Sequence, residues 1–132
     1  MNERIYVSIV SYRDPQLLPT LKNMLKMAEK PNLLKVCIVW QHDKNDVWDS
    51  LDTYKDDKRF EIIDINAADS QGVCWARAIA QKRWKNEGYF LQIDSHMRFT
   101  KNWDTRLKNM LVMLQEDGYP KPLLTTYVPS YD

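Results

Sequence analysis

A carboxylate and an imidazole stand two residues apart at Asp94 and His96, directly after the apolar run 89–93. Alternate side chains of an extended segment lie on the same side, so both groups could reach a single cation. A carboxylate oxygen with an imidazole nitrogen suits Mn²⁺ or another first-row ion better than Mg²⁺, and two protein ligands leave positions for phosphate groups. In the alternative interpretation, Asp94 caps the following turn and His96 is a surface residue.

Two arginines are placed where they could bind an anion or a nucleotide base. Arg13 follows a buried strand and Tyr12, so its guanidinium could reach a phosphate or a base carbonyl while the tyrosine ring stacks. Alternatively, Arg13 pairs with Asp14 or another surface carboxylate. Arg77 falls in the first turns of a predicted helix, where its charge opposes the helix dipole. A diphosphate or nucleotide contact and a simple ion pair are therefore both open for Arg77.

Two further features carry weaker signals. Gly72 precedes the same predicted helix and could let the backbone approach a ligand, although a single glycine also marks an ordinary turn. His42 and Asp43 resemble a second metal pair, but they open a charged stretch that runs to Arg59. Solvated loop residues explain this second pair better than a metal site does.

Apolar runs rich in β-branched residues predict the strands that must position these groups. The runs cover residues 5–10, 35–40, 60–65 and 89–93, and a last strand is predicted over residues 123–128. Strands that alternate with helices at this spacing predict an α/β fold, with a mostly parallel, Rossmann-like sheet flanked by helices.

Three helices are predicted from their capping residues and their apolar spacing. The first begins at Pro15 with Asp14 as its cap and is closed by Pro31; the second covers residues 73–86; the third follows Asn102. Gly118 is placed as the stop of the third helix. The predicted buried face of the second helix consists of Val73, Ala76, Ala80 and Trp84. That of the third helix consists of Trp103, Leu107, Met110, Leu111 and Leu114.

Polar clusters follow three of the predicted strands, at residues 11–14, 41–43 and 94–96. In open α/β sheets, ligands bind in the crevice beyond the carboxyl ends of the strands. The three clusters therefore predict a ligand site at one edge of the sheet.

Composition excludes several classes of protein. The 132 residues are enough for one domain, which we assign to residues 1–132, and the net charge of +1 argues against a nucleic-acid or acidic-membrane partner. There is no apolar run of membrane-spanning length and no signal-peptide pattern. Cys37 and Cys74 show no metal-ligand spacing, so we expect reduced thiols and a cytoplasmic location.

Four segments of the chain, in this order, resemble a known family. They are residues 5–15 (IYVSIVSYRDP), Gln41, residues 72–77 (GVCWAR) and residues 91–99 (LQIDSHMRF), with Trp103 and Asp104 after them. Together they resemble the N-acetylglucosaminyltransferases that modify hydroxyproline on a cytoplasmic ubiquitin-ligase adaptor, and the bacterial and protist relatives of these enzymes. The resemblance covers nearly the whole chain, and the run from Leu91 to Phe99 is more specific than any single Asp-x-His.

The resemblance implies a GT-A type glycosyltransferase fold, a UDP-sugar donor, usually UDP-GlcNAc, and transfer with retention to a hydroxyl of protein hydroxyproline or of a glycan. It implies that Asp94 and His96 bind a divalent metal, Mn²⁺ first and Mg²⁺ second, as the Asp-x-His version of the Asp-x-Asp motif. The residues that it assigns to the UDP-sugar are Ser11, Tyr12, Arg13, Gln41, Arg77, Asp94 and Ser95. It leaves the catalytic residues and the oligomeric state unassigned.

GT-A enzymes are normally longer than this chain, because later residues build the acceptor site and usually supply a third metal ligand. We therefore expect the donor-binding half of the fold, truncated in the acceptor half. Other functions stay open: a non-catalytic nucleotide-sugar-binding module, a metal-dependent phosphoesterase in which Asp94 and His96 activate water, and a structural domain with a solvated rim.

Overall fold

Four parallel strands form the central sheet in the computed structural model, which describes residues 2–126 and 128–130. The strand order is β3-β2-β1-β4, and every neighbouring pair is parallel. The strands are β1 (Ile5–Tyr12), β2 (Leu34–His42), β3 (Phe60–Asn66) and β4 (Tyr89–Asp94). The four strands predicted from apolar runs before residue 100 are confirmed, each extended by one to three residues at one or both ends.

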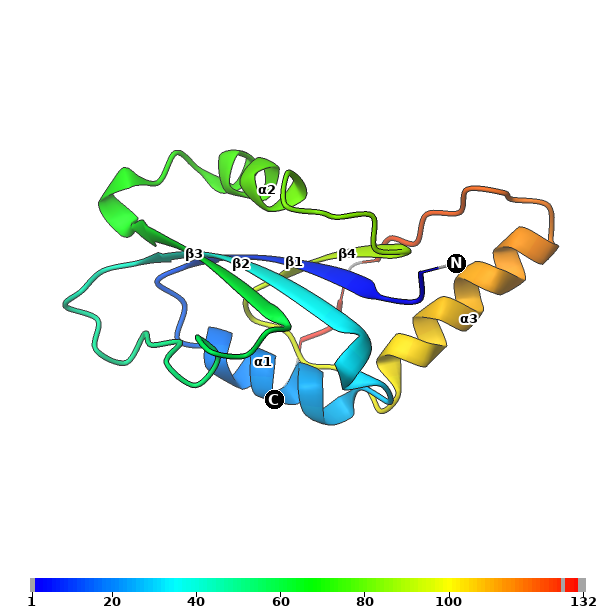
Figure 1. Ribbon diagram of the computed structural model, residues 1–132, viewed down its shortest axis with the longest axis horizontal. Helices are drawn as coiled ribbons and strands as arrows, with labels where there is room; N and C mark the ends of the chain where they lie inside the picture. Colours follow the sequence, from blue (N-terminus) through cyan, green and yellow to red (C-terminus); the bar gives the residue numbers. More distant parts are fainter. Residues whose placement is uncertain (1, 127, 131–132) are drawn as a thin grey trace.

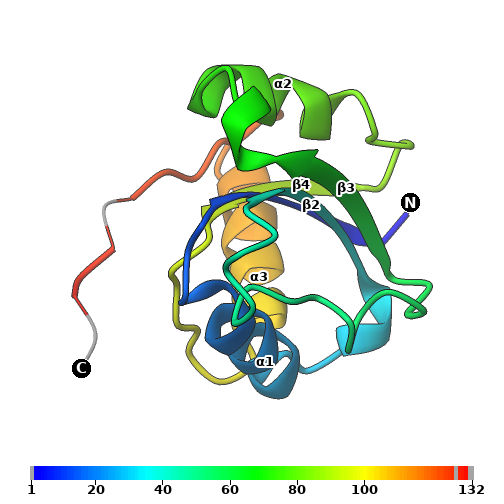
Figure 2. The same ribbon diagram turned by 90° about the vertical axis from the view of Figure 1, so that its left-hand side faces the viewer.

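Helices cover both faces of the sheet, as Figures 1 and 2 show: α2 (Val73–Gln81) lies on one face, and α1 (Leu17–Met27) and α3 (Trp103–Glu116) lie on the other. Two short 3₁₀ turns, Pro31–Leu33 and Ala67–Asp69, complete the described elements. The segment 43–59 is irregular, as expected from its charged composition. The predicted α/β architecture, a parallel sheet flanked by helices, is confirmed.

Side chains of β1 and β2 are buried on both faces, which explains why their sequences are almost continuously apolar. Ile5, Val7 and Ile9 pack in the cluster with α1, whereas Tyr6 packs with Ala76 and Ala80 of α2. Small residues at 76 and 80 let α2 approach the sheet closely.

The predicted strand over residues 123–128 is wrong for the residues described there. Residues 123–126 and Val128 form no strand, and Tyr127 lies outside the described residues. Leu123 is 83% exposed. A strand needs a partner for its backbone N–H and C=O groups, and these residues pair with none of the four described strands.

The first helix begins later than the capping pattern predicts. Gln16, not Asp14, is the residue before the first helical turn, and the Asp14 carboxylate accepts the Gln16 N–H at 2.9 Å. The other carboxylate oxygen, Oδ2, accepts the Ser95 hydroxyl of the loop after β4, and the first helical turn starts at Leu17. Pro31 lies beyond the helix end, in the first 3₁₀ turn.

The second helix is shorter than predicted, because the chain turns after Gln81. Trp84 Nε1–H donates to the Glu87 carbonyl at 3.0 Å, and the Lys85 N–H donates to the Glu87 carboxylate at 3.0 Å. Trp84 therefore lies beyond the helix and is exposed, and Val73, the first residue of α2, is exposed as well.

The third helix has the predicted ends but only part of the predicted buried face. Trp103 is buried, Leu107, Leu111 and Leu114 are half-buried, and Met110 is exposed, because α3 runs away from the sheet after its first turns (Figure 1). Asn102 makes no side-chain cap. The Gly118 stop is confirmed: its φ is +102°, its N–H donates to Gln115, and the Tyr119 N–H donates to Leu114.

Candidate functional site

The crevice of the sheet lies where the strand order reverses. The chain passes from β1 to β2 and β3 on one side, and β4 then pairs on the other side of β1. Loops leaving β1 and β4 therefore diverge at the carboxyl ends of these strands, which is where α/β sheets bind ligands. A pocket of about 340 Å³ lies there, a volume in the range of small-molecule sites. Its lining is Val10, Tyr12, Asp14, Gln41, Ser70, Gly72, Val73, Asp94, Ser95 and His96.

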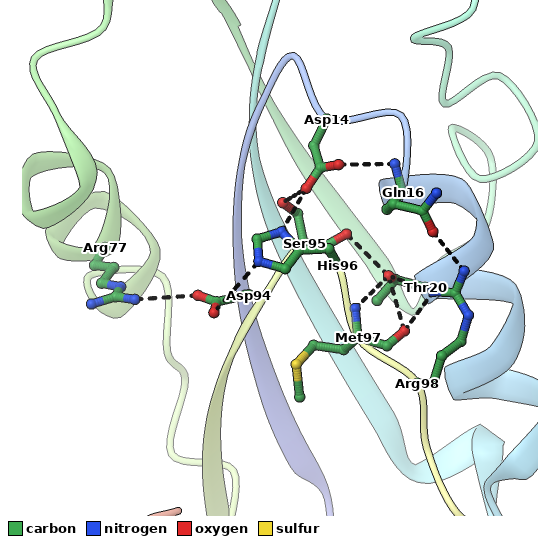
Figure 3. Close-up of polar contacts among 9 residues, drawn as sticks. All are labelled: Asp14, Gln16, Thr20, Arg77, Asp94, Ser95, His96, Met97 and Arg98. Carbon is green, nitrogen blue, oxygen red and sulfur yellow. Dashed lines mark hydrogen bonds and ion pairs between the residues drawn. The ribbon is translucent and has the colours of Figure 1, made fainter. Parts of the chain in front are cut away.

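Asp94 and His96 lie together at the end of β4, with Oδ2 of Asp94 3.9 Å from Nε2 of His96 (Figure 3). Both side chains are accessible, at 55% and 58% exposed. Two ligands of one first-row cation, each at about 2.1 Å, are about 3.0 Å apart at a right angle and about 4.2 Å apart in line. The pair has the donor types of a first-row cation site, and its separation of 3.9 Å lies between these two values.

The described residues 2–126 and 128–130 contain no group of three or more His, Cys, Asp and Glu side chains arranged to hold a metal. A cation at Asp94 and His96 would thus keep most of its coordination positions for ligands other than these two side chains.

Asp14 connects the loop after β1 to the loop after β4, as Figure 3 shows. Its Oδ2 accepts the Ser95 hydroxyl at 2.6 Å and lies 2.8 Å from Nδ1 of His96. Burial alone would raise the pKa of Asp14, but the hydrogen bonds from Ser95, the Gln16 N–H and His96 outweigh burial and lower that pKa below its ordinary value. The carboxylate therefore stays charged. The sequence assigned Asp14 to a helix cap, although its place after a strand at the rim was a signal for the site.

The loop after β4 is held by the buried Thr20 of α1. The Met97 N–H donates to Thr20 Oγ1 at 2.8 Å, and the threonine hydroxyl lies 3.0 Å from the Ser95 carbonyl and 3.1 Å from the Met97 carbonyl. The Phe99 N–H donates to Asn23 Oδ1 at 2.6 Å. Helix α1 thus fixes the backbone of the loop that contains His96.

Arg77 approaches the site from α2, on the side opposite Asp14 (Figure 3). Its Nη2 lies 3.5 Å from Asp94 Oδ1. The ion pair is long and both partners are accessible, so it contributes little to stability and an anion in the pocket could compete for the guanidinium. Of the two interpretations left open by the sequence, the structure shows the ion pair.

Tyr12 and Gln41 are neighbours in the register of β1 and β2, and both line the pocket. Tyr12 is 54% exposed. Gln41 is buried; its Nε2 donates to the Ser11 carbonyl at 3.1 Å, and its Oε1 accepts the Ser70 hydroxyl. An amide has two N–H donors and two acceptor positions, so Gln41 keeps one of each for a ligand.

Gly72 lines the pocket with a φ of +104°. A Cβ there would meet nothing within 4 Å. The backbone conformation, rather than lack of space, explains the glycine at this position.

Ser11, Arg13 and Arg77, three residues that the resemblance assigns to the UDP-sugar, do not line the pocket. Ser11 is fully buried within β1. Arg13 has a φ of +46°, which directs its guanidinium to the loop of residues 43–59, where it binds Asp46 with two hydrogen bonds of 2.6 and 3.1 Å.

His42 is part of β2 and does not pair with Asp43 as a metal site. Its Nε2 lies 2.6 Å from Asp64 Oδ1, and its ring stacks on Trp40 with 3.4 Å between the centroids. The ring is therefore engaged on the β3 side of the sheet. This contact explains His42 without a ligand.

Within the described residues, no helix has the length and apolar character needed to cross a membrane. Both cysteines of the chain are free, Cys37 in the core and Cys74 at the surface.

The comparisons with known proteins agree with this architecture. A family model described as "Glycosyltransferase (GlcNAc)" matches residues 4–59 and 53–132. Among solved structures, the chain is similar to S. aureus TarS 1-349, with a TM-score of 0.62 and 17% sequence identity, over 86% of this chain and 32% of that chain. The chain thus spans about a third of that structure, and the likeness supports the predicted GT-A type fold. A search of curated proteins found no match.

Proposed function

The chain belongs to the glycosyltransferase (GlcNAc) family, and from that premise we propose that its pocket binds a UDP-sugar, with UDP-GlcNAc as the glycosyl donor. One observation carries the proposal: the pocket at the carboxyl ends of β1 and β4 joins a stacking surface, a hydrogen-bonding amide and a carboxylate–imidazole pair. These are the groups that a base, a ribose and a diphosphate need. The predicted donor residues Tyr12, Gln41, Asp94 and Ser95 all line it.

In this proposal the nucleotide base lies against Tyr12. The exposed ring offers a face for stacking, and the unused donor and acceptor of Gln41 match the N–H and C=O groups on the edge of uracil. Because Gln41 is already held by Ser11 and Ser70, it would bind the base without losing much side-chain freedom.

Asp94 and His96 would hold the divalent metal, Mn²⁺ in our proposal with Mg²⁺ as the second choice. When bound, such a cation acts as a Lewis acid that stabilises the charge of the departing diphosphate. Arg77 lies within reach of the same carboxylate and can turn to a phosphate oxygen as its long ion pair opens. Gln41 and Ser95, which are buried, would shield one side of the donor from water.

We extend the proposal to the transfer step on the strength of the family resemblance. The sugar would pass with retention of its anomeric configuration to a hydroxyl group, of hydroxyproline in a protein or of a glycan, and the reaction would take place in the cytoplasm. The residues that the resemblance also assigns to uridine, Ser11 and Arg13, stay predictions from the sequence; their positions give the proposal no support.

Calorimetric titration of UDP and UDP-GlcNAc, each with and without Mn²⁺, tests the donor site. We expect binding that requires Mn²⁺ and that is lost in Asp94→Ala. Asp64→Ala is the matched control, because it removes an exposed carboxylate that does not line the pocket. Metal-independent binding, or equal loss in the control, would contradict the metal assignment, and no binding of either compound would contradict the donor site.

Release of UDP from UDP-GlcNAc separates a transferase from a non-catalytic binding module, since the same contacts would serve both. Turnover, even slow hydrolysis without an acceptor, supports the enzyme; binding without any UDP release supports the module. A phosphoesterase is the weaker alternative, because neither a second metal cluster nor an obvious base that would activate water accompanies Asp94 and His96 in the described part of the chain.

A further inference from the structure

The two ring nitrogens of His96 have different surroundings. Nδ1 lies 2.8 Å from Asp14 Oδ2, whereas Nε2 lies 3.9 Å from Asp94 Oδ2 (Figure 3). A neutral imidazole carries one proton, so one nitrogen donates and the other offers a lone pair. Asp14 Oδ2 accepts hydrogen bonds, so the proton belongs on Nδ1 and the lone pair on Nε2.

Two hydrogen bonds fix the orientation of the Asp14 carboxylate. The backbone N–H of Gln16 donates to Oδ1 at 2.9 Å, and the buried Ser95 hydroxyl donates to Oδ2 at 2.6 Å. The carboxylate belongs to the loop between β1 and α1, while the ring that it contacts belongs to the loop after β4. The orientation of His96 is therefore set from another element of the fold.

We propose that Asp14 is a positioning residue, which holds the His96 ring with Nδ1 protonated and the Nε2 lone pair turned toward Asp94. This inference rests on the proposed function, because the Nε2 lone pair would bind the divalent cation that the proposal places at Asp94 and His96. Metal-binding histidines donate their other ring N–H to a carboxylate or carbonyl, and removal of that partner weakens metal binding about 10- to 100-fold.

The second histidine of the chain provides an internal reference. The sequence contains only two histidines, and His42 contacts its carboxylate, Asp64, through Nε2 rather than Nδ1. The same reasoning assigns the opposite tautomer, with the proton on Nε2, to His42. One long-range ¹H–¹⁵N spectrum of the metal-free chain, at a pH where both rings are neutral, reads both tautomers.

We expect His96 as the Nδ1–H form and His42 as the Nε2–H form in that spectrum. The wild-type chain suffices for this measurement, so no variant has to fold for the result to count. His96 in the Nε2–H form would overturn the assignment, whatever the metal binding of the chain.

Asp14→Asn then tests the consequence for metal binding. Because the Gln16 N–H can only donate, the new amide oxygen takes the Oδ1 position, and the NH₂ group faces His96 Nδ1, which must then accept. We expect His96 to shift toward the Nε2–H form and the broadening of its ring signals by Mn²⁺ to need about 10- to 100-fold more metal. Asp64→Asn is the control; it should shift His42 alone and leave the Mn²⁺ titration of His96 unchanged.

An unchanged His96 tautomer in Asp14→Asn, or a Mn²⁺ affinity within about threefold of wild type, would overturn the inference. Absence of Mn²⁺ broadening at His96 in the wild-type chain would instead contradict the proposed function. The tautomer of the metal-free ring decides the role of Asp14 separately.

Discussion

Replacement of Thr20 by valine tests whether α1 fixes the loop that carries His96. Valine keeps the shape of the buried side chain but removes the hydroxyl that accepts the Met97 N–H at 2.8 Å and lies within 3.1 Å of two loop carbonyls. The Met97 N–H then loses its partner next to a fully buried position.

The Met97 N–H is half-buried, so leaving it without a partner costs about 1–2 kcal/mol, and the lost donation from the hydroxyl adds about 0.5–1.5 kcal/mol. We therefore expect Thr20→Val to lower the free energy of unfolding by about 1.5–3.5 kcal/mol. Thr20→Ser is the matched control: it keeps both hydrogen bonds and removes one methyl group, for a loss of about 1 kcal/mol.

Chemical denaturation of the three proteins in one buffer measures these differences, and amide exchange at Met97 and Phe99 reports the loop directly. We expect faster exchange at both amides in Thr20→Val and little change in Thr20→Ser. Equal stability of wild type and Thr20→Val, or a larger loss in the serine variant, would refute the view that this hydroxyl holds the loop.

Three further predictions concern other contacts. Tyr12→Ala should weaken UDP binding by about 1–3 kcal/mol through lost stacking. Arg13→Ala should leave UDP binding nearly unchanged, because Arg13 is bound to Asp46 outside the pocket. Calorimetry of both variants measures these effects, and a large loss of UDP binding in Arg13→Ala would restore the sequence-based assignment. Asp104→Asn should cost about 1.5–3 kcal/mol at neutral pH, since the buried carboxylate accepts the N–H groups of Glu29 and Lys30. Burial alone would raise the pKa of Asp104, but these N–H groups lower it below its ordinary value of 3.8. The contribution of Asp104 to the free energy of unfolding is thus present above that value and is lost as the pH falls through the lowered pKa. Denaturation curves of wild type and Asp104→Asn should therefore show a stability difference that shrinks from neutral to acidic pH. Gly72→Ala should cost about 1–3 kcal/mol, because φ +104° with ψ 174° is a backbone conformation that is essentially restricted to glycine; a thermal shift no larger than that of an exposed helical substitution would contradict this.

Much of the fold was predictable because local sequence patterns indicate its strands and the ends of its helices. The buried strands β1 and β2 are apolar on both faces, so their sequences show continuous apolar runs, and Gly118 marks the end of α3 through a backbone conformation that glycine adopts most easily. The predictions that failed concern segments whose structure depends on packing against other parts of the chain. Residues 123–126 have the composition of a strand but no strand to pair with, and Met110 has the spacing of a buried face but no surface to cover it.

The candidate site divides in the same way. Asp94 and His96 were found from their spacing, since alternation along an extended chain is a local property, and their proximity agrees with that prediction. Tyr12 and Gln41 were found because polar residues at the ends of parallel strands meet at one edge. Asp14 was placed in the polar cluster after the first strand, but its predicted role was a helix cap, since its contacts with Ser95 and His96 cross 81 and 82 residues of sequence.

The sequence by itself thus determined which residue types stand at the carboxyl ends of the strands, and with them the α/β class and the family. Only the tertiary structure decided which of these side chains face one pocket. Neighbouring residues of a strand point to opposite faces, so Tyr12 lines the pocket while Ser11 is buried; a positive φ at Arg13 then directs its guanidinium to Asp46. The partner of a polar group depends on packing between distant segments, which no local pattern encodes.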